Sequence, residues 1–305
     1  KRNDIINVKD KVIEFETGNV LIGSVSRLYM SNKCLLIADH KSVDKQIHIF
    51  NKNDFSYLTS IGNFGEGPEE ITVMGCLAID EAHHQLYVSD HAKQKIFSYD
   101  MDSVMVDSLY KPQVKTAMNE TLFPSEYQYI NDTLSIAVLI KPTSTSTFNQ
   151  FLGRWNMNTG EMIPMKYTHP DIQKKRITFA ASEKAGIYVE CYTRHDLMTI
   201  CSLDGELLYN IYGPDWDGGN GNKLQSFGTV MIGNDKIFVS YCGEDYARDS
   251  FPTKILVFDL EGNYLKTLET GYKISDCCYD SFNNRIILSL NDVVQFAYLD
   301  IDGII

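Results

Sequence analysis

Long apolar runs, basic stretches and helical periodicity are all missing from this sequence. No apolar run approaches the roughly 18–20 residues that a membrane-spanning helix needs. The formal net charge is -12 and no basic segment interrupts it, so neither nucleic acid nor an anionic lipid surface is an expected partner. Apolar residues do not recur with a helical period over long segments, which argues against a helical fold.

Sequence signatures of catalysis and metal binding are also missing. There is no GxSxG, HExxH or P-loop motif, and no GxGxxG follows an expected strand. The seven cysteines lack the spacing of a zinc ribbon or a CxxC site, so we expect most of them to be buried apolar residues. Residues 215–222 resemble a calcium loop only in part, because Gly219 and Ser226 stand where that loop needs ligands. The expected cofactor set is empty, with calcium the one ion left open.

A short phrase recurs six times: an apolar residue, two variable residues, a large apolar or aromatic residue, then Asp or Asn. The copies begin at Ile47, Ile96, Leu152, Ile200, Ile255 and Phe296. A second apolar pattern recurs at a similar interval, with copies that begin at Leu35, Leu86, Leu134, Ile187, Ile237 and Ile286. Strand-and-turn repeats of roughly 50 residues indicate a radial array of small antiparallel sheets.

The repeats predict an all-β fold, a six-bladed β-propeller of four-stranded antiparallel blades in a single domain over residues 1–305. In the second blade we expect an outer strand over residues 104–110. The last repeat is too short for an outer strand of its own. An N-terminal strand at about residues 12–17 is therefore expected to complete the last blade and close the ring.

Loop lengths distinguish the two faces that such a fold would have. On one face, the turns between first and second strands and between third and fourth strands are short and rich in Asn, Asp and Gly. The long segments all belong to the other face, here called the long-loop face. They are the blade links 62–74, 112–124, 164–176 and 213–226, and the within-blade loops 141–150 and 243–253. Because binding sites favour loops on rigid frames, we expect the ligand on the long-loop face, at the mouth of the central channel.

Aligned inner strands bring a mixed polar set toward that mouth. The equivalent positions are Arg27, Cys76, Tyr127, Thr178, Thr229 and Asp276. Together with Arg176 and Trp216, the residues Arg27, Tyr127 and Asp276 are the candidate ligand contacts. Two alternatives stay open: the polar groups bind one another and channel water, and Trp216 plugs the seam between blades. His40 and His91 each follow an Asp at the same repeat position, which explains them better than a metal or catalytic role does.

Residues 62–71, GNFGEGPEEI, are similar to the G-x-x-G-x-G-P-G-E-F link of NHL-type repeats, with Glu69 in place of the usual Gly. Residues 86–90, LYVSD, followed by Ile96 and Asp100, are similar to that family's strand pattern. The chain thus resembles the TolB-like and NHL-like six-bladed propellers, especially uncharacterised exported lipoproteins of gut bacteria. The resemblance implies six blades and an exported, lipid-anchored type of protein. Some six-bladed relatives are calcium-dependent lactonases, but only Asp276 matches their channel residues.

We expect a non-catalytic binding or scaffolding propeller of the bacterial envelope, a monomer that binds a protein, peptide or glycan. The alternative is a metal-assisted, lactonase-like hydrolase or lyase with its site at the channel mouth. The expected location is the periplasm or cell surface. The first residues are polar and show no signal peptide, so an export signal and any lipid anchor are expected upstream of this sequence.

Overall fold

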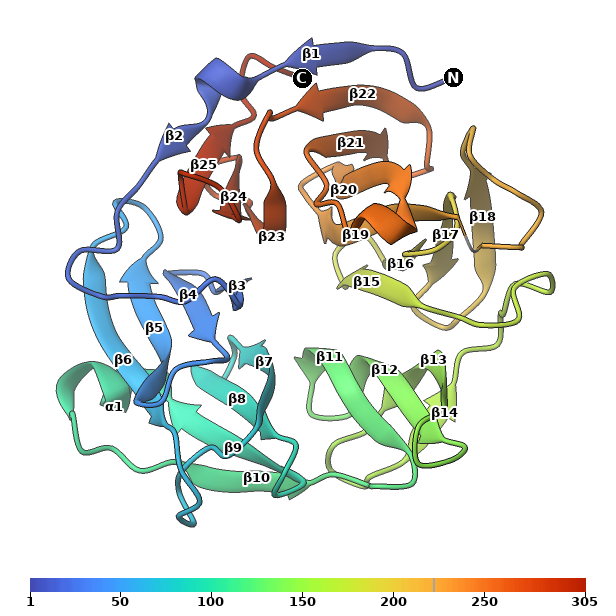
Figure 1. Cartoon of the computed structure of the whole chain (residues 1–305). Helices are drawn as coiled ribbons and strands as arrows, with labels where there is room; N and C mark the ends of the chain where they lie inside the picture. The colour runs from blue at the N-terminus through green and yellow to red at the C-terminus, as the bar shows by residue number, and fades with distance from the viewer. Residues whose placement is uncertain (222) are drawn as a thin grey trace. The chain divides into compact units, whose positions relative to one another are not determined.

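The computed structural model describes residues 1–221 and 223–305. Their strands form six sheets, and most of each sheet is a run of consecutive antiparallel strands. The fold is an all-β propeller with six blades of four antiparallel strands, as the repeats predict (Figure 1). The chain divides into two compact units: the N-unit, Thr17–Met165, and the C-unit, Lys1–Glu16 with Lys166–Ile305. The expectation of a single domain stays a prediction.

The N-unit contains the first three blades. Blade 1 has β3 (Ser26–Met30), β4 (Cys34–Asp39), β5 (Lys45–Asn51) and β6 (Tyr57–Asn63). Blade 2 has β7 (Met74–Asp80), β8 (Gln85–Asp90), β9 (Lys95–Asp100) and β10 (Gln113–Ala117), with helix α1 (Met101–Val106) between the last two strands. Blade 3 has β11 (Phe123–Asn131), β12 (Leu134–Pro142), β13 (Phe148–Trp155) and β14 (Met162–Pro164).

The C-unit contains the other three blades and the N-terminal segment. Blade 4 has β15 (Ile177–Ser182), β16 (Ile187–Tyr192), β17 (Leu197–Ser202) and β18 (Leu207–Tyr212). Blade 5 has β19 (Leu224–Ile232), β20 (Lys236–Asp245), the 3₁₀ turn η2 (Tyr246–Arg248), β21 (Lys254–Asp259) and β22 (Tyr264–Glu269). Blade 6 has β23 (Ile274–Asp280), β24 (Arg285–Leu290) and β25 (Phe296–Asp300). The N-terminal segment has β1 (Ile5–Asn7), η1 (Lys9–Lys11) and β2 (Ile13–Glu14).

Each copy of the recurring phrase begins in the third strand of its blade. In blades 1, 2, 3 and 5, the Asn or Asp that ends the phrase accepts hydrogen bonds from the turn that follows. Asn51 Oδ1 accepts the backbone N–H of Asn53 at 2.8 Å, and Asp259 Oδ1 accepts that of Glu261 at 2.9 Å. The repeated residue is therefore a turn cap, which explains why only short-chain Asn and Asp occupy it.

The predicted N-terminal strand is confirmed. β2 pairs antiparallel with β25, and the N–H of Phe15 extends the pairing to the carbonyl of Phe296 at 3.1 Å, so the segment completes the sheet of the last blade (Figure 1). The sequence did not predict β1, which adds in parallel to the outer edge of β22 and makes blade 5 five-stranded. Residues 1–16 therefore contribute strands to two sheets of the C-unit.

The predicted outer strand over residues 104–110 is wrong. Helix α1 occupies its first part because the Asp100 carboxylate caps the helix, accepting the N–H of Ser103 at 2.9 Å. The outer strand is β10 instead, so residues 112–124 are not a simple blade link. The loops 141–150 and 243–253 are also shorter than predicted, because the flanking strands continue to Pro142 and Asp245.

Apolar side chains fill the space between neighbouring blades within each unit. One cluster joins blades 1 and 2 and includes Leu36, Ile49, Leu77 and Val88, all nearly fully buried. Others join blades 2 and 3, blades 4 and 5, and blades 5 and 6. All seven cysteines are free and six are buried, consistent with an apolar role. In the part of the chain that the structure describes, no helix is long and apolar enough to cross a membrane.

Candidate functional site

Two of the predicted contacts, Arg27 and Tyr127, lie on inner strands β3 and β11 of the N-unit. The Arg27 guanidinium forms an ion pair with Glu126, and the two side chains are 41% and 36% exposed. Tyr127 is only 4% exposed and packs edge-on against Trp155, with 5.1 Å between ring centroids. Burial raises the pKa of the Tyr127 phenol well above its usual range. Of this pair, only Arg27 is accessible to a ligand.

Arg176 and Asp276, predicted contacts in the C-unit, are bound by their own surroundings. Arg176 Nη1 donates to the carbonyl of Lys175 at 2.7 Å, and burial together with Arg194 lowers the pKa of its guanidinium. Asp276 is buried and accepts the hydroxyl hydrogen of Thr229 at 2.9 Å. Both groups are thus committed to contacts within the protein.

Trp216, the remaining predicted contact, lies in the link between β18 and β19. Its ring is partly buried and lies 5.0 Å from Tyr212, 5.5 Å from His169 and 6.0 Å from His195, between ring centroids. His169 Nε2 is also 2.8 Å from the Tyr212 hydroxyl. These contacts make Trp216 the centre of an aromatic group within the C-unit. Asn222, which ends the partial calcium-loop pattern, lies outside the described residues.

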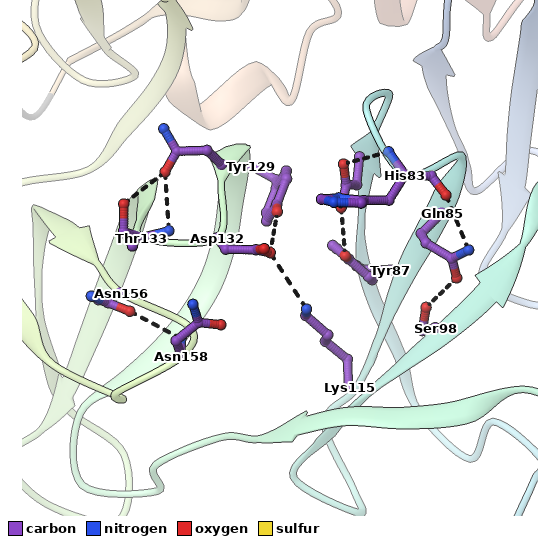
Figure 2. Close-up of polar contacts among 12 residues, drawn as sticks. His83, Gln85, Tyr87, Ser98, Lys115, Tyr129, Asp132, Thr133, Asn156 and Asn158 are labelled. Atoms are coloured by element: carbon purple, nitrogen blue, oxygen red, sulfur yellow. Dashed lines mark hydrogen bonds and ion pairs between the residues drawn. The ribbon is translucent and has the colours of Figure 1, made fainter.

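A polar group gathers where the short turns of blades 2 and 3 meet in the N-unit. We call it the turn cluster: Asp80, His83, Tyr87, Lys115, Tyr129 and Asp132. The Tyr87 hydroxyl donates to Asp80 Oδ2 at 2.7 Å, and His83 Nδ1 lies 2.8 Å from the same oxygen. Figure 2 shows Tyr129 and Lys115 converging on Asp132, at 2.5 Å and 3.6 Å from Oδ1.

The hydrogen bonds of the turn cluster favour ionised carboxylates and neutral phenols. Burial opposes the ionisation of Asp80, but bonds from Tyr87 and His83 outweigh it and hold the pKa of that carboxyl below its usual value. The bond from Tyr129 is the main cause that lowers the pKa of Asp132. Burial first, and then these carboxylates, raise the pKa of both phenols. The cluster therefore holds two negative charges beside one ammonium group.

Three members of the cluster have the donor atoms of a metal site. Asp80, His83 and Asp132 each offer an atom within 4.8 Å of the other two, the only such trio among residues 1–221 and 223–305. Nitrogen and carboxylate donors suit Zn²⁺. However, the equivalent turn of blade 6 has the same geometry without a histidine: Asp280 accepts both the backbone N–H and the side-chain N–H of Asn283. The contact between Asp80 and His83 is thus first of all a turn cap of the repeat.

Exposed apolar side chains stand in the loops at the long-loop face of blades 1 and 2. We call this set the loop-face patch: Leu21, Val25, Val43, Phe64 and Val73. All are exposed, and Leu21 and Val43 reach 94% and 82%. They lie in the link before β3, the loop between β4 and β5, and the link between β6 and β7. A continuous exposed apolar patch marks an interaction surface, so these three loops are candidates for a docking surface.

Hydrogen bonds hold the backbone under the loop-face patch. The N–H of His40 donates to the carbonyl of Val25 at 3.2 Å, and that of His91 to the carbonyl of Val73 at 2.8 Å. The N–H of Phe64 donates to the carbonyl of Asp44 at 2.8 Å. His40 Nε2 also lies 3.2 Å from the Gly75 carbonyl oxygen. The patch is therefore apolar side chains on a fixed backbone, which lowers the entropy cost of binding.

Sequence reasoning missed the turn cluster and the loop-face patch for different reasons. Asp80 and Asp132 belong to separate repeats, and both have the composition of ordinary turns. The patch residues are single apolar residues in polar loops, each unremarkable alone. One signal in the sequence could have indicated the loop-face patch. Val25 and Val73 are apolar residues that each stand just before an inner strand, where a solvated link favours polar residues.

Comparison with known proteins supports the fold. Residues 1–151 match the family DUF5128, described as a 6-bladed beta-propeller. A candidate exported protein of Bacteroides fragilis superposes with a TM-score of 0.59 at 14% identity, over 93% of this chain and 85% of that one. A member of the DUF4221 family from Bacteroides vulgatus gives 0.60 at 10% identity, over 94% of each chain.

The propeller domain of Cps50 (Swd1) from Myceliophteria thermophila gives a TM-score of 0.58 at 10% identity, over 94% of this chain and 98% of that one. Identities this low show a shared fold and nothing more. No curated protein matches the sequence. Over residues 1–151 the chain is therefore similar to the DUF5128 family of 6-bladed beta-propellers.

Proposed function

We propose that this protein is a non-catalytic binding propeller whose partner is a protein or peptide that docks on the loop-face patch. The observation that carries the proposal is the exposure of Val43, Leu21 and their neighbours on loops whose backbone is held by hydrogen bonds. Burying such aliphatic groups against a partner releases about 25 cal/mol for each Å² of apolar surface. Association is therefore the property that this surface supports best.

A protein or peptide fits the patch better than a glycan does. Sugars are usually bound on flat aromatic rings, with polar groups that bind their hydroxyls. Four of the five patch residues are aliphatic, and Phe64 is the single aromatic one. Aliphatic surface matches the apolar centre of a protein interface.

Export to the bacterial envelope is part of the proposal. Its support is the likeness to a candidate exported protein of Bacteroides fragilis and the acidic composition without basic segments. A lipid anchor would keep such a propeller at the membrane surface while its long loops bind a partner. Protease protection and fractionation of the natural cells would test this location.

Site-specific photo-crosslinking in cells that naturally produce the protein tests the docking surface. A photoreactive residue at position 43 should give discrete protein adducts, and the change Val73→Glu in the same chain should abolish them. Val106, in α1 and 87% exposed, provides the matched control because it is an equally exposed valine outside the patch. Equal adducts from positions 43 and 106, or adducts that survive Val73→Glu, would contradict the proposal.

A metal-assisted hydrolase or lyase is the second candidate, and the trio Asp80, His83 and Asp132 is the observation that favours it. Zinc and calcium titrations of the purified protein would test it. Stoichiometric binding that is lost in His83→Ala would support this reading, since that side chain is 60% exposed and its removal should spare the fold. Binding lost instead in Asp276→Asn would point to the channel-mouth site expected from the sequence.

A further inference from the structure

The side chain of Arg2 enters a box of aromatic rings in the C-unit. Its guanidinium carbon lies 5.2 Å from the ring centroid of Tyr241, 5.6 Å from Phe227 and 5.9 Å from Phe258. All three rings are buried. Distances within about 6 Å of an aromatic face are those at which a cation gains energy from the ring. Three rings around one guanidinium make a cage rather than a chance contact.

A buried carboxylate completes the box. Asp196 Oδ1 lies 2.8 Å from Arg2 Nη1, and the two side chains are 0% and 11% exposed. Asp196 Oδ2 accepts the N–H of Asp215 at 3.1 Å. Gly213 makes room for the carboxylate, because a Cβ at this position would lie only 2.1 Å from its oxygens. The link between β18 and β19 is thus shaped around Asp196.

The chemistry of the box selects a guanidinium group. A planar, permanently charged guanidinium can stack on rings and pair with a carboxylate at once, whereas an ammonium group is a strongly hydrated point charge. With the box empty, the buried charge of Asp196 would lack its partner, at a cost of several kcal/mol. The box therefore has a strong requirement for a cation of this shape.

The arginine that fills the box comes from an arm, residues 1–4, that is otherwise exposed. Lys1, Asn3 and Asp4 point to solvent, and the arm continues into β1 on the edge of β22. The carbonyl of Asp4 accepts the N–H of Thr267 at 2.8 Å. One anchored side chain on a strand added to a sheet edge is the way in which many extended peptides bind to proteins.

We propose that the box of Phe227, Tyr241, Phe258 and Asp196 is a binding site for the guanidinium group of an arginine side chain, filled in cis by Arg2. When the arm withdraws, the box takes an arginine of a partner peptide, and the arm competes with that ligand. The site lies in the C-unit and does not depend on the loop-face patch.

Binding of N-acetyl-L-argininamide to the full chain tests the proposal. Calorimetry should show at least about tenfold tighter binding to Arg2→Ala than to the wild type, because the variant empties the box. The neutral isostere N-acetyl-L-citrullinamide should not bind. The double variant Arg2→Ala/Asp196→Asn keeps the rings but loses the charge, so its affinity for argininamide should fall at least about tenfold below that of Arg2→Ala.

If Arg2→Ala does not fold, Arg2→Lys provides the same test, since its ammonium group keeps the charge but fits the rings less well. Argininamide should then bind more tightly to Arg2→Lys than to the wild type and raise its unfolding temperature. The proposal is overturned if neither Arg2→Ala nor Arg2→Lys binds argininamide more tightly than citrullinamide, since Arg2 would then be a structural residue only.

Discussion

The two units each contain a prominent arginine paired with a carboxylate, and the pairs differ in burial. In the C-unit, Arg2 and Asp196 are 11% and 0% exposed, and aromatic rings surround the guanidinium. In the N-unit, Arg27 and Glu126 are 41% and 36% exposed, and the Arg27 guanidinium carbon lies 5.4 Å from the ring centroid of Tyr29. Both join parts of the chain that are far apart in sequence.

The difference teaches that burial, not the presence of an ion pair, decides what each arginine does. An exposed pair is screened by water and contributes about 0–1 kcal/mol, so Arg27 can leave Glu126 for a ligand at small cost. A buried pair is tied to its partner because breaking it leaves an uncompensated charge. The ion pair of Arg27 is therefore easily broken, whereas Arg2 latches the N-terminal segment to the C-unit until another guanidinium takes its place in the box.

Deleting the N-terminal segment, which contains Arg2 and the strands β1 and β2, should lower the stability of the protein more than any other change. Deletion of residues 1–16 takes away β1, β2, the fully buried Val8 and the Arg2 side chain. We expect a loss of more than about 5 kcal/mol, comparable to the whole free energy of unfolding of many domains. Urea denaturation followed by circular dichroism measures it. An unchanged denaturation midpoint would show that the N-terminal segment does not hold the last blades together.

Single substitutions at the two arginines test the comparison directly. Arg2→Ala should lower the free energy of unfolding by about 3 kcal/mol, because it leaves Asp196 buried without its cation. Arg27→Ala, the matched control, should cost less than about 1 kcal/mol. Chemical denaturation of both variants gives the two values, and similar losses would refute the role assigned to burial.

Two glycines beside buried carboxylates sharpen the comparison further. A Cβ at Gly213 would lie 2.1 Å from Asp196, whereas a Cβ at Gly23 would lie 3.2 Å from Asp39. We expect Gly213→Ala to cost about 1–3 kcal/mol, because a carboxylate held under a ring box cannot move aside easily. Gly23→Ala should cost less. Thermal unfolding of the two variants measures both losses of stability. A larger loss in Gly23→Ala would mean that the Asp196 carboxylate can move aside easily.

Strand periodicity was enough to predict the blades. The recurring phrase has a physical cause. Its apolar residues fill the spaces between blades, and its Asn or Asp caps the following turn in blades 1, 2, 3 and 5. The prediction of a strand over residues 104–110 was wrong because apolar residues such as Val104 and Val106 alternate there as they do in a strand. The deciding interaction was instead the local cap formed by Asp100, which started a helix.

The candidate sites could be predicted much less well. The turn cluster joins Asp80 and Asp132 through folding alone, and each carries the signature of a plain turn. Arg2 gives no periodic signal, since its partners come from three strands of blade 5 and from the loop between β16 and β17, all far along the chain. Inner-strand alignment did place Arg27 on an inner strand, β3, because a repeat fixes position along each strand. Burial of individual side chains, such as that of Tyr127, depends on neighbours that a repeat does not specify.

The histidines provide the last and smallest test, because both units contain histidines that are buried or partly buried. Burial is the main cause that lowers the pKa of His40 and His91 in the N-unit, and of His169 and His195 in the C-unit. The unfolded chain therefore binds protons first as the pH falls below the ordinary value of about 6.5, and the folded state loses stability there. Above that pH both states are neutral and the effect vanishes.

Each histidine can change the free energy of unfolding by at most about 1.4 kcal/mol per pH unit. Its contribution is smaller where water screens the ring. We expect the free energy of unfolding to be flat between pH 7 and 8 and to decrease toward pH 5.5, measured by urea denaturation at each pH. His91→Gln should reduce the decrease, since its ring approaches Phe123 at 4.7 Å between centroids in a partly buried setting. His84→Gln serves as the control, because the imidazole it removes is 56% exposed. A slope that His91→Gln does not alter would assign the acid sensitivity to carboxylates instead.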